Sequence, residues 1–169
     1  AVASGIVAIA HATDAAGSIR VPAACCGVWG LKPSRGATPE GPDFGNHLMG
    51  IASELVLARS LRDVATVFHA VTGTAPDARR DQTFRIGLCL PEETAPETVA
   101  ALKATAATLC EHGHVVTEMP PPYELAQACD RTARMILSVS LADWIDALGL
   151  IEPDITPISA TIAHEARAM

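Results

Sequence analysis

The stretch "HATDAAGSIRVPAACCG", from His11 to Gly27, decides the fold of this chain. The run before and into it, Ile6 to Thr13, is short and nearly continuous in apolar residues, which is typical of a buried β-strand. Asp14 to Gly17 then predicts a tight turn, and Ser18 begins a short helix that ends near Gly27. The stretch therefore predicts a strand that turns sharply into a helix.

The predicted turn places small residues at the N-terminus of that helix. Backbone N–H groups there lack partners inside the helix, and the helix dipole favours negative charge. Small residues let successive N–H groups converge on one point, which suits the oxyanion of a tetrahedral acyl-transfer intermediate. The donors would be the N–H groups of Ala15, Ala16, Gly17 and Ser18. Of these, Gly17 is the residue we expect to need a backbone conformation closed to other residues.

Three polar side chains of this stretch have two interpretations each. Ser18 is either a nucleophile for a carbonyl carbon or only the N-cap of the helix, a position that serine favours. Asp14 and Arg20 either pair across the turn and brace it from behind, or form a solvent-exposed pair that contributes well under about 1 kcal/mol.

Further along the chain, strands and helices alternate. Apolar residues at helical spacing predict a helix over 59–73, with Ser60 and Asp63 as a capping box and Gly73 as its end. The segments "RIGLCL" and "HVVTEM" predict strands on either side of a helix over 96–112, which indicates a parallel crossover. Longer helical patterns cover 125–148 and 156–169. The fold class predicted is α/β: one partial domain over 1–169, with a core at 1–73 and an additional α/β and helical segment at 74–169.

Three blocks in fixed order resemble the amidase signature family: "TDAAGSIRVPA", "CGVWGLKP" and "ARSLRD". The variant "TDAAGS" and the later "EHGHVV" are similar to the branch that includes 6-aminohexanoate cyclic dimer hydrolase. The resemblance implies a mixed central β-sheet covered by helices. It also implies a Ser–cis-Ser–Lys triad in which the bridging serine and the lysine lie upstream of Ala1, so we expect a piece of a longer protein.

The resemblance assigns a role to each matching residue. Ser18 matches the nucleophile, and Ala15, Ala16, Gly17 and Ser18 match the oxyanion hole. Thr13, Asp14 and Arg20 match structural residues that hold this segment in shape. One departure is that Ala15 and Ala16 stand where the family commonly has glycine. Alanine resists positive φ, so the oxyanion hole would be deformed if either position required it.

Other residues offer alternatives for the proton of Ser18. His11 would give a conventional Ser–His pair, although a histidine at the end of a buried strand is more often a packed core residue. Lys32 matches a structural family position, and Lys103 is the only other lysine. Cys25 and Cys26 lie too far into the helix to be activated at its N-terminus, and we expect them to be buried.

Composition excludes several classes of function. The net charge of −7 argues against nucleic acid and anionic membrane surfaces as partners, and no apolar run is long enough to span a membrane. The five cysteines contain no C-x-x-C pair, so we expect reduced thiols and a cytoplasmic location. No dinucleotide-binding or phosphate-binding loop occurs, and we expect neither a cofactor nor a metal.

The function predicted is hydrolysis of linear or cyclic amides through an acyl-enzyme on Ser18, with little activity from these 169 residues alone. Two alternatives stay open: the A subunit of a glutamine-dependent aminoacyl-tRNA amidotransferase, and a truncated relative without catalysis. The partners expected are a small-molecule amide and the rest of a parent chain, and a homodimer is left open. Variable loops such as 41–50 would help to select the substrate.

Overall fold

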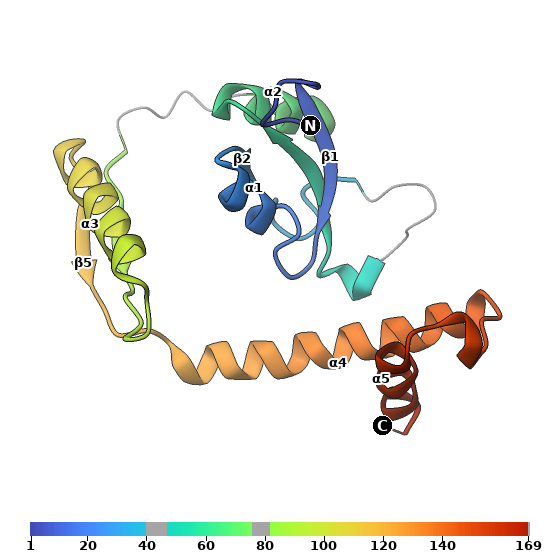
Figure 1. The fold of residues 1–169 in the computed structure, drawn as a ribbon. Helices are drawn as coiled ribbons and strands as arrows, with labels where there is room; N and C mark the ends of the chain where they lie inside the picture. The colour runs from blue at the N-terminus through green and yellow to red at the C-terminus, as the bar shows by residue number, and fades with distance from the viewer. Residues whose placement is uncertain (40–46, 76–81, 169) are drawn as a thin grey trace. The chain divides into compact units, whose positions relative to one another are not determined.

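The computed structural model describes residues 1–39, 47–75 and 82–168 (Figure 1). The chain divides into two compact units, Ala1–Pro76 with Arg131–Met169, and Asp77–Asp130. The first boundary falls close to the predicted one at residue 73, whereas the C-terminal residues group with the first unit. The domain division predicted from the sequence stays a prediction.

A three-stranded antiparallel sheet organises the first unit. The strands are β1 (Ile9–Asp14), β2 (Trp29–Gly30) and β3 (Ser53–Ala58), in the order β1-β3-β2. The predicted buried strand is β1, but it begins later than expected and exposes Ile9 and His11. The expectation of full burial is wrong because β1 pairs antiparallel at a sheet edge, where one face can remain in contact with water.

Sequence analysis did not predict β3, the central strand. Its sequence, "SELVLA", lacks the alternation of a half-buried strand, and its position depends on pairing with β1 on one side and β2 on the other. These partners lie far away in the sequence, so no local pattern announces the strand. The segment 41–50, predicted to be a variable loop, is described only from His47 to Gly50, a single 3-10 turn (η1).

Two helices of the first unit follow their predicted limits closely. Helix α1 covers Arg20–Cys26 and ends at Gly27, which has the left-handed conformation. Helix α2 covers Leu61–Thr72, where the Ser60 hydroxyl accepts a hydrogen bond from the Asp63 N–H at 3.1 Å. Gly27 and the N-cap Ser60 are therefore as predicted, whereas only one of the two hydrogen bonds of the predicted capping box is found among the described residues.

The main hydrophobic core lies among β1, β3, α2 and the residue that precedes α1. Its fully or nearly fully buried members are Ile19, Leu55, Val56, Ala58 and Val64. Ile19 directly follows Ser18, so the chain on one side of the candidate nucleophile is fixed in the core. This packing makes the Ser18 turn a rigid part of the unit rather than a free loop.

The second unit is the predicted strand–helix–strand crossover. It contains β4 (Arg85–Leu88), α3 (Pro96–Glu111) and β5 (Val115–Glu118), and β4 pairs parallel with β5. Figure 1 shows α3 lying alongside β5. The parallel pairing confirms the crossover read from the two apolar segments and the helix between them.

The long helix α4 (Tyr123–Ala147) leads to a short 3-10 turn, η2 (Glu152–Asp154), and then to α5 (Pro157–Arg167). A second small core joins α4 and α5 through Ala142, Ile145, Ala163 and Ala166. The sequence predicted both helices within a few residues. Together, these elements confirm the α/β fold class.

Candidate active site

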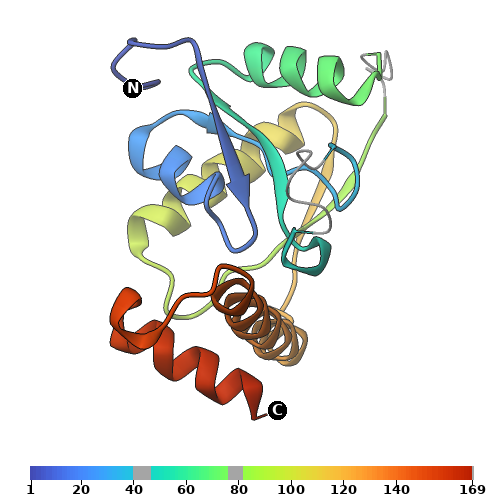
Figure 2. The same cartoon turned by 90° about the vertical axis from the view of Figure 1, so that its right-hand side faces the viewer.

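Figure 2 shows the turn that joins β1 to α1, which follows the end of the β1–β3 pair. This turn is organised around the buried carboxylate of Asp14. Asp14 Oδ1 accepts a hydrogen bond from the Gly17 N–H at 2.7 Å. Asp14 Oδ2 accepts from the N–H groups of Ile19 and Arg20, at 3.2 and 3.3 Å. The carboxylate therefore accepts hydrogen bonds from N–H groups at the start of α1, the task that an N-cap side chain usually performs.

Arg20 completes the environment of this carboxylate. Its Nε donates to Oδ2 and its Nη2 to Oδ1, each at 2.9 Å, in a bidentate ion pair. The Asp14 side chain is 0% exposed and that of Arg20 is 54% exposed. The predicted brace is therefore present, and the alternative of a pair exposed to solvent on both sides is wrong.

The ion pair also changes the acidity of both side chains. The Arg20 guanidinium is the largest cause that holds the pKa of Asp14 well below its usual range. Backbone hydrogen bonds from Gly17, Arg20 and Ile19 lower this pKa further, while burial works in the opposite direction. The same contact raises the pKa of Arg20. Asp14 is therefore a permanent anion near neutral pH and is unsuited to proton transfer.

Ser18 stands at the surface of this turn, immediately before the buried Ile19. Its hydroxyl has no hydrogen-bond partner among residues 1–39, 47–75 and 82–168. The residue at the N-cap of α1 is Ile19, and Ser18 supplies no capping bond. The interpretation of Ser18 as a helix cap is therefore wrong, because Asp14 already has that role.

The backbone around Ser18 keeps three free donors. Within the described part of the chain, the N–H groups of Ala15, Ala16 and Ser18 have no hydrogen-bond partner. The Gly17 N–H, by contrast, already donates to Asp14, so it could serve an oxyanion only by sharing its hydrogen. Of the four donors predicted from the sequence, three are therefore free among the described residues, and the fourth, the Gly17 N–H, is engaged with Asp14.

Gly17 has a conformational role instead. Its φ is +125°, and a Cβ at this position would come within 2.9 Å of the Val21 Cγ2 atom. The expectation that Gly17 needs a conformation closed to other residues is confirmed. Ala15 and Ala16 are not among the non-glycine residues with positive φ, so alanine fits both positions without the feared deformation.

The rival proton acceptors have other partners or other surroundings. His11 Nε2 lies 2.8 Å from Glu54 Oε2, and its side chain is 71% exposed, so the expectation of a core histidine is wrong. Lys32 Nζ donates to Ser53 Oγ at 3.1 Å, consistent with a structural role. Cys25 and Cys26 are exposed, which contradicts their predicted burial. They lie in the last turn of a seven-residue helix, whose other face carries the buried Ala23.

Two further residues of the sequence blocks now have physical explanations. A Cβ on Gly30 would come within 2.8 Å of both Ile19 Cγ2 and Ala23 Cβ, so only glycine lets β2 lie this close to α1. The Arg59 guanidinium donates to the carbonyl oxygens of Val2 and Val7, at 2.8 and 2.9 Å. The close approach at Gly30 holds the segment that follows α1, and the Arg59 hydrogen bonds hold the segment that precedes β1.

Sequence reasoning missed the partner of Thr13. The Thr13 hydroxyl donates to Glu54 Oε2 at 2.7 Å, the same oxygen that His11 contacts. Thr13 and Glu54 are directly opposite each other in the β1–β3 ladder. A correct prediction of β3 would have been needed to find Glu54, since nothing in its local sequence marks it.

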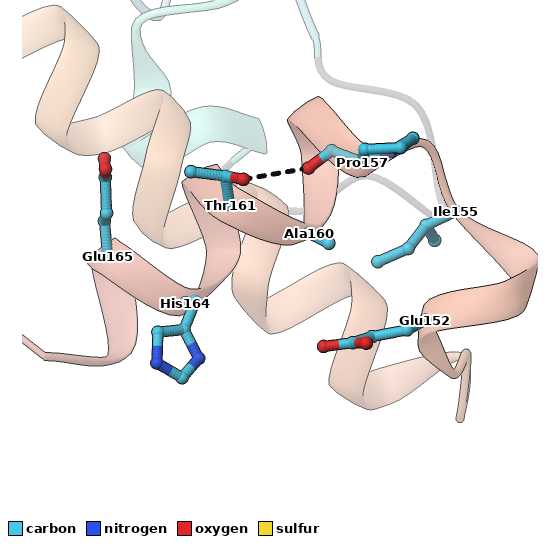
Figure 3. A pocket seen from close by; sticks show the side chains of 7 residues that line it. All are labelled: Glu152, Ile155, Pro157, Ala160, Thr161, His164 and Glu165. Atoms are coloured by element: carbon cyan, nitrogen blue, oxygen red, sulfur yellow. Dashed lines mark hydrogen bonds between the residues drawn. The ribbon is translucent and has the colours of Figure 1, made fainter.

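A surface hollow of about 610 Å³ lies between η2 and α5 and contains none of the predicted site residues (Figure 3). The Thr161 hydroxyl at its wall donates to the Pro157 carbonyl within α5. Among the residues that the structure describes, no three His, Cys, Asp or Glu side chains are grouped so that they could hold a metal ion. In the same residues, no helix is long and apolar enough to cross a membrane.

Comparisons with known proteins give a consistent result. The family model described as Amidase matches residues 1–148. The 6-aminohexanoate-cyclic-dimer hydrolases of Pseudomonas sp. (strain NK87) and Paenarthrobacter ureafaciens are each 36% identical over 144 residues, which is 72% of this chain and 29% of the relative. The chain therefore spans less than a third of the length of these curated relatives.

Solved structures show the same fold. A crystal structure of an amidase superposes with a TM-score of 0.78 at 24% identity, covering 99% of this chain and 39% of that one. The native peptide amidase of Stenotrophomonas maltophilia gives a TM-score of 0.67 at 25% identity, covering 99% and 42%.

Proposed function

The chain belongs to the amidase family, and we propose that it carries the nucleophile and the oxyanion hole of an enzyme that hydrolyses amide bonds. The observation that carries the proposal is the exposed Ser18 hydroxyl, which has no partner among the described residues and stands on a turn with free backbone donors. The buried Asp14–Arg20 pair holds that turn in place. A nucleophile on a rigid turn beside preorganised donors is the arrangement that acyl transfer requires.

The reaction proceeds in two steps. Ser18 Oγ attacks the amide carbonyl carbon while its proton passes to a base, and the N–H groups of Ala15, Ala16 and Ser18 stabilise the oxyanion. The intermediate collapses, the amine leaves with the proton, and the acyl group remains as an ester on Ser18. Water then attacks the ester, which releases the carboxylic acid and restores the hydroxyl.

The general base that accepts the Ser18 proton is a separate question from the nucleophile and the oxyanion donors. Of the two lysines in the chain, Lys32 donates a hydrogen bond to the Ser53 hydroxyl, and Lys103 belongs to α3. His11 is paired with Glu54. We assign the general base to a lysine that acts through a bridging serine, because the family resemblance implies this pair. The name of two curated relatives, 6-aminohexanoate-cyclic-dimer hydrolase, favours a small cyclic amide as the substrate.

A fluorophosphonate probe, which reacts with activated serines, tests this assignment in the full-length protein. We expect one label on the peptide that contains Ser18, and Ser18→Ala should abolish the label and lower amide turnover at least about 1,000-fold. Ser34→Ala is the matched control, because Ser34 is also exposed in the same unit. Labelling that survives in Ser18→Ala would refute the nucleophile assignment. No label on a well-folded protein would favour a relative without catalysis.

A further inference from the structure

A second polar cluster, His11, Thr13 and Glu54, lies on the sheet immediately before the Asp14 turn; we call it the Glu54 cluster. We propose that Glu54 is a positioning residue for the reaction of Ser18, which it reaches through Thr13 and the end of β1. The inference rests on the proposed function. It adds a residue of the central strand β3 to the residues of the turn that position Ser18 and the oxyanion donors.

Strand pairing creates the cluster. Thr13 and Glu54 are directly opposite in the antiparallel ladder, so their side chains lie on the same face of the sheet. His11 is two residues before Thr13 and therefore shares this face. Glu54 Oε2 receives the Thr13 hydroxyl at 2.7 Å and lies 2.8 Å from His11 Nε2. One carboxylate oxygen thus contacts two residues, His11 and Thr13, on the same face of β1.

Burial makes these contacts costly to lose. The Glu54 side chain is only 11% exposed, whereas that of His11 is 71% exposed. A carboxylate with little access to water depends on its hydrogen bonds to remain favourable, so removing the Thr13 hydroxyl leaves an acceptor poorly satisfied. Glu54 therefore adds a side-chain link at Thr13 to the backbone pairing of β1 and β3.

The consequence reaches Ser18 through the backbone. Thr13 is bonded to Asp14, and the free donors at Ala15 and Ala16 follow within three residues. A displacement of about 1 Å in catalytic groups can cost about 100-fold in rate. The Asp14–Arg20 pair holds the turn from the helix side, and the Glu54 cluster holds it from the strand side. Both anchors are needed to place the oxyanion donors.

The test compares Thr13→Val, Thr13→Ser and Glu54→Gln in the full-length protein, with kcat expressed per active site titrated by the fluorophosphonate probe. We expect Thr13→Val and Glu54→Gln each to lower kcat about 10-fold with KM within about 2-fold, because substrate binding is retained while the oxyanion donors shift. Thr13→Ser keeps the hydroxyl and should stay within about 2-fold of wild type. Thr66→Val is the matched control, since that hydroxyl only bonds the Arg62 carbonyl on exposed α2.

Each outcome is decisive. A purely structural role would reduce the number of titrated sites without changing kcat per site, and that result would overturn the proposal. Equal losses in Thr13→Val and Thr13→Ser would also overturn it. If Thr13→Val fails to fold, Glu54→Gln and Thr13→Ser decide. The double variant Thr13→Val/Glu54→Gln should be no worse than the poorer single variant, because both changes act on the same contact: Thr13→Val removes its donor, and Glu54→Gln replaces its charged acceptor by a neutral amide. Loss of activity in Ser18→Ala with full activity in Glu54→Gln would leave the proposed function intact and reject only this inference.

Discussion

Two Asp–Arg pairs in this chain contain the same chemical groups in different surroundings. Asp14 is 0% exposed and accepts three backbone N–H groups besides Arg20. Asp146 on α4 is 62% exposed, and its partner Arg167 on α5 is 44% exposed. In both pairs the aspartate raises the pKa of the arginine. An Asp–Arg ion pair alone therefore does not fix the shape of a site. It does so when the carboxylate is buried and also accepts hydrogen bonds from the backbone, as Asp14 does.

The largest effect should follow from Asp14→Asn. The amide nitrogen would face at least one of the backbone donors that the carboxylate now accepts, and Arg20 would lose its counter-charge. Breaking a buried pair in this way costs about 3 kcal/mol, and the donors beside Ser18 would lose their fixed positions. We expect urea denaturation to show that loss of stability, and turnover to fall at least about 100-fold. Wild-type turnover in a stable Asp14→Asn protein would contradict the proposed role of this pair.

The pH dependence of stability gives the next effect. Because folding lowers the pKa of Asp14, its contribution to stability is fully present above its unfolded pKa of about 3.9 and is lost as the pH falls toward the folded pKa. The difference in unfolding free energy between wild type and Asp14→Asn should therefore stay constant from about pH 5 to 8. It should shrink only below about pH 4. A difference that already shrinks between pH 7 and 5 would show that another group is responsible.

A smaller effect is expected for Gly17→Ala. The alanine would have to adopt φ near +125°, and its Cβ would lie 2.9 Å from Val21 Cγ2. We expect a loss of about 2 kcal/mol in stability and a clear loss of turnover, because the strain acts on the segment that carries Ser18. Gly73→Ala is the matched control, since φ there is +66° and nothing lies within 4 Å of the added Cβ. It should lower stability by about 1 kcal/mol without changing kcat. Equal changes in kcat for both variants would remove the special role of Gly17.

The features that the sequence could predict are those that depend on residues close together in the chain. Caps and turns are local, so Ser60, Gly27 and the conformation of Gly17 followed from residues within a few positions of each other. The Asp14–Arg20 pair is also local, and its two residues could be proposed as a brace. The central strand β3 could not be predicted, because its place depends on pairing across about forty residues. Without β3, neither the role of Glu54 nor its contact with His11 could be predicted.

The smallest effect should belong to Asp146→Asn, which makes the same chemical change as Asp14→Asn in the other pair. Both partners are partly exposed, and Asp146, unlike Asp14, is open to water, so solvent already screens their attraction and can replace the lost hydrogen bonds. We expect a change in Tm of less than about 2 °C, a further decrease of that change in high salt, and unaltered turnover. The measurement is thermal unfolding at low and high ionic strength beside Asp14→Asn. If Asp146→Asn destabilised the protein as much as Asp14→Asn, then exposure and backbone contacts would not determine how much each ion pair contributes to stability. The stability of the α4–α5 packing would then depend on this ion pair rather than on its buried alanines.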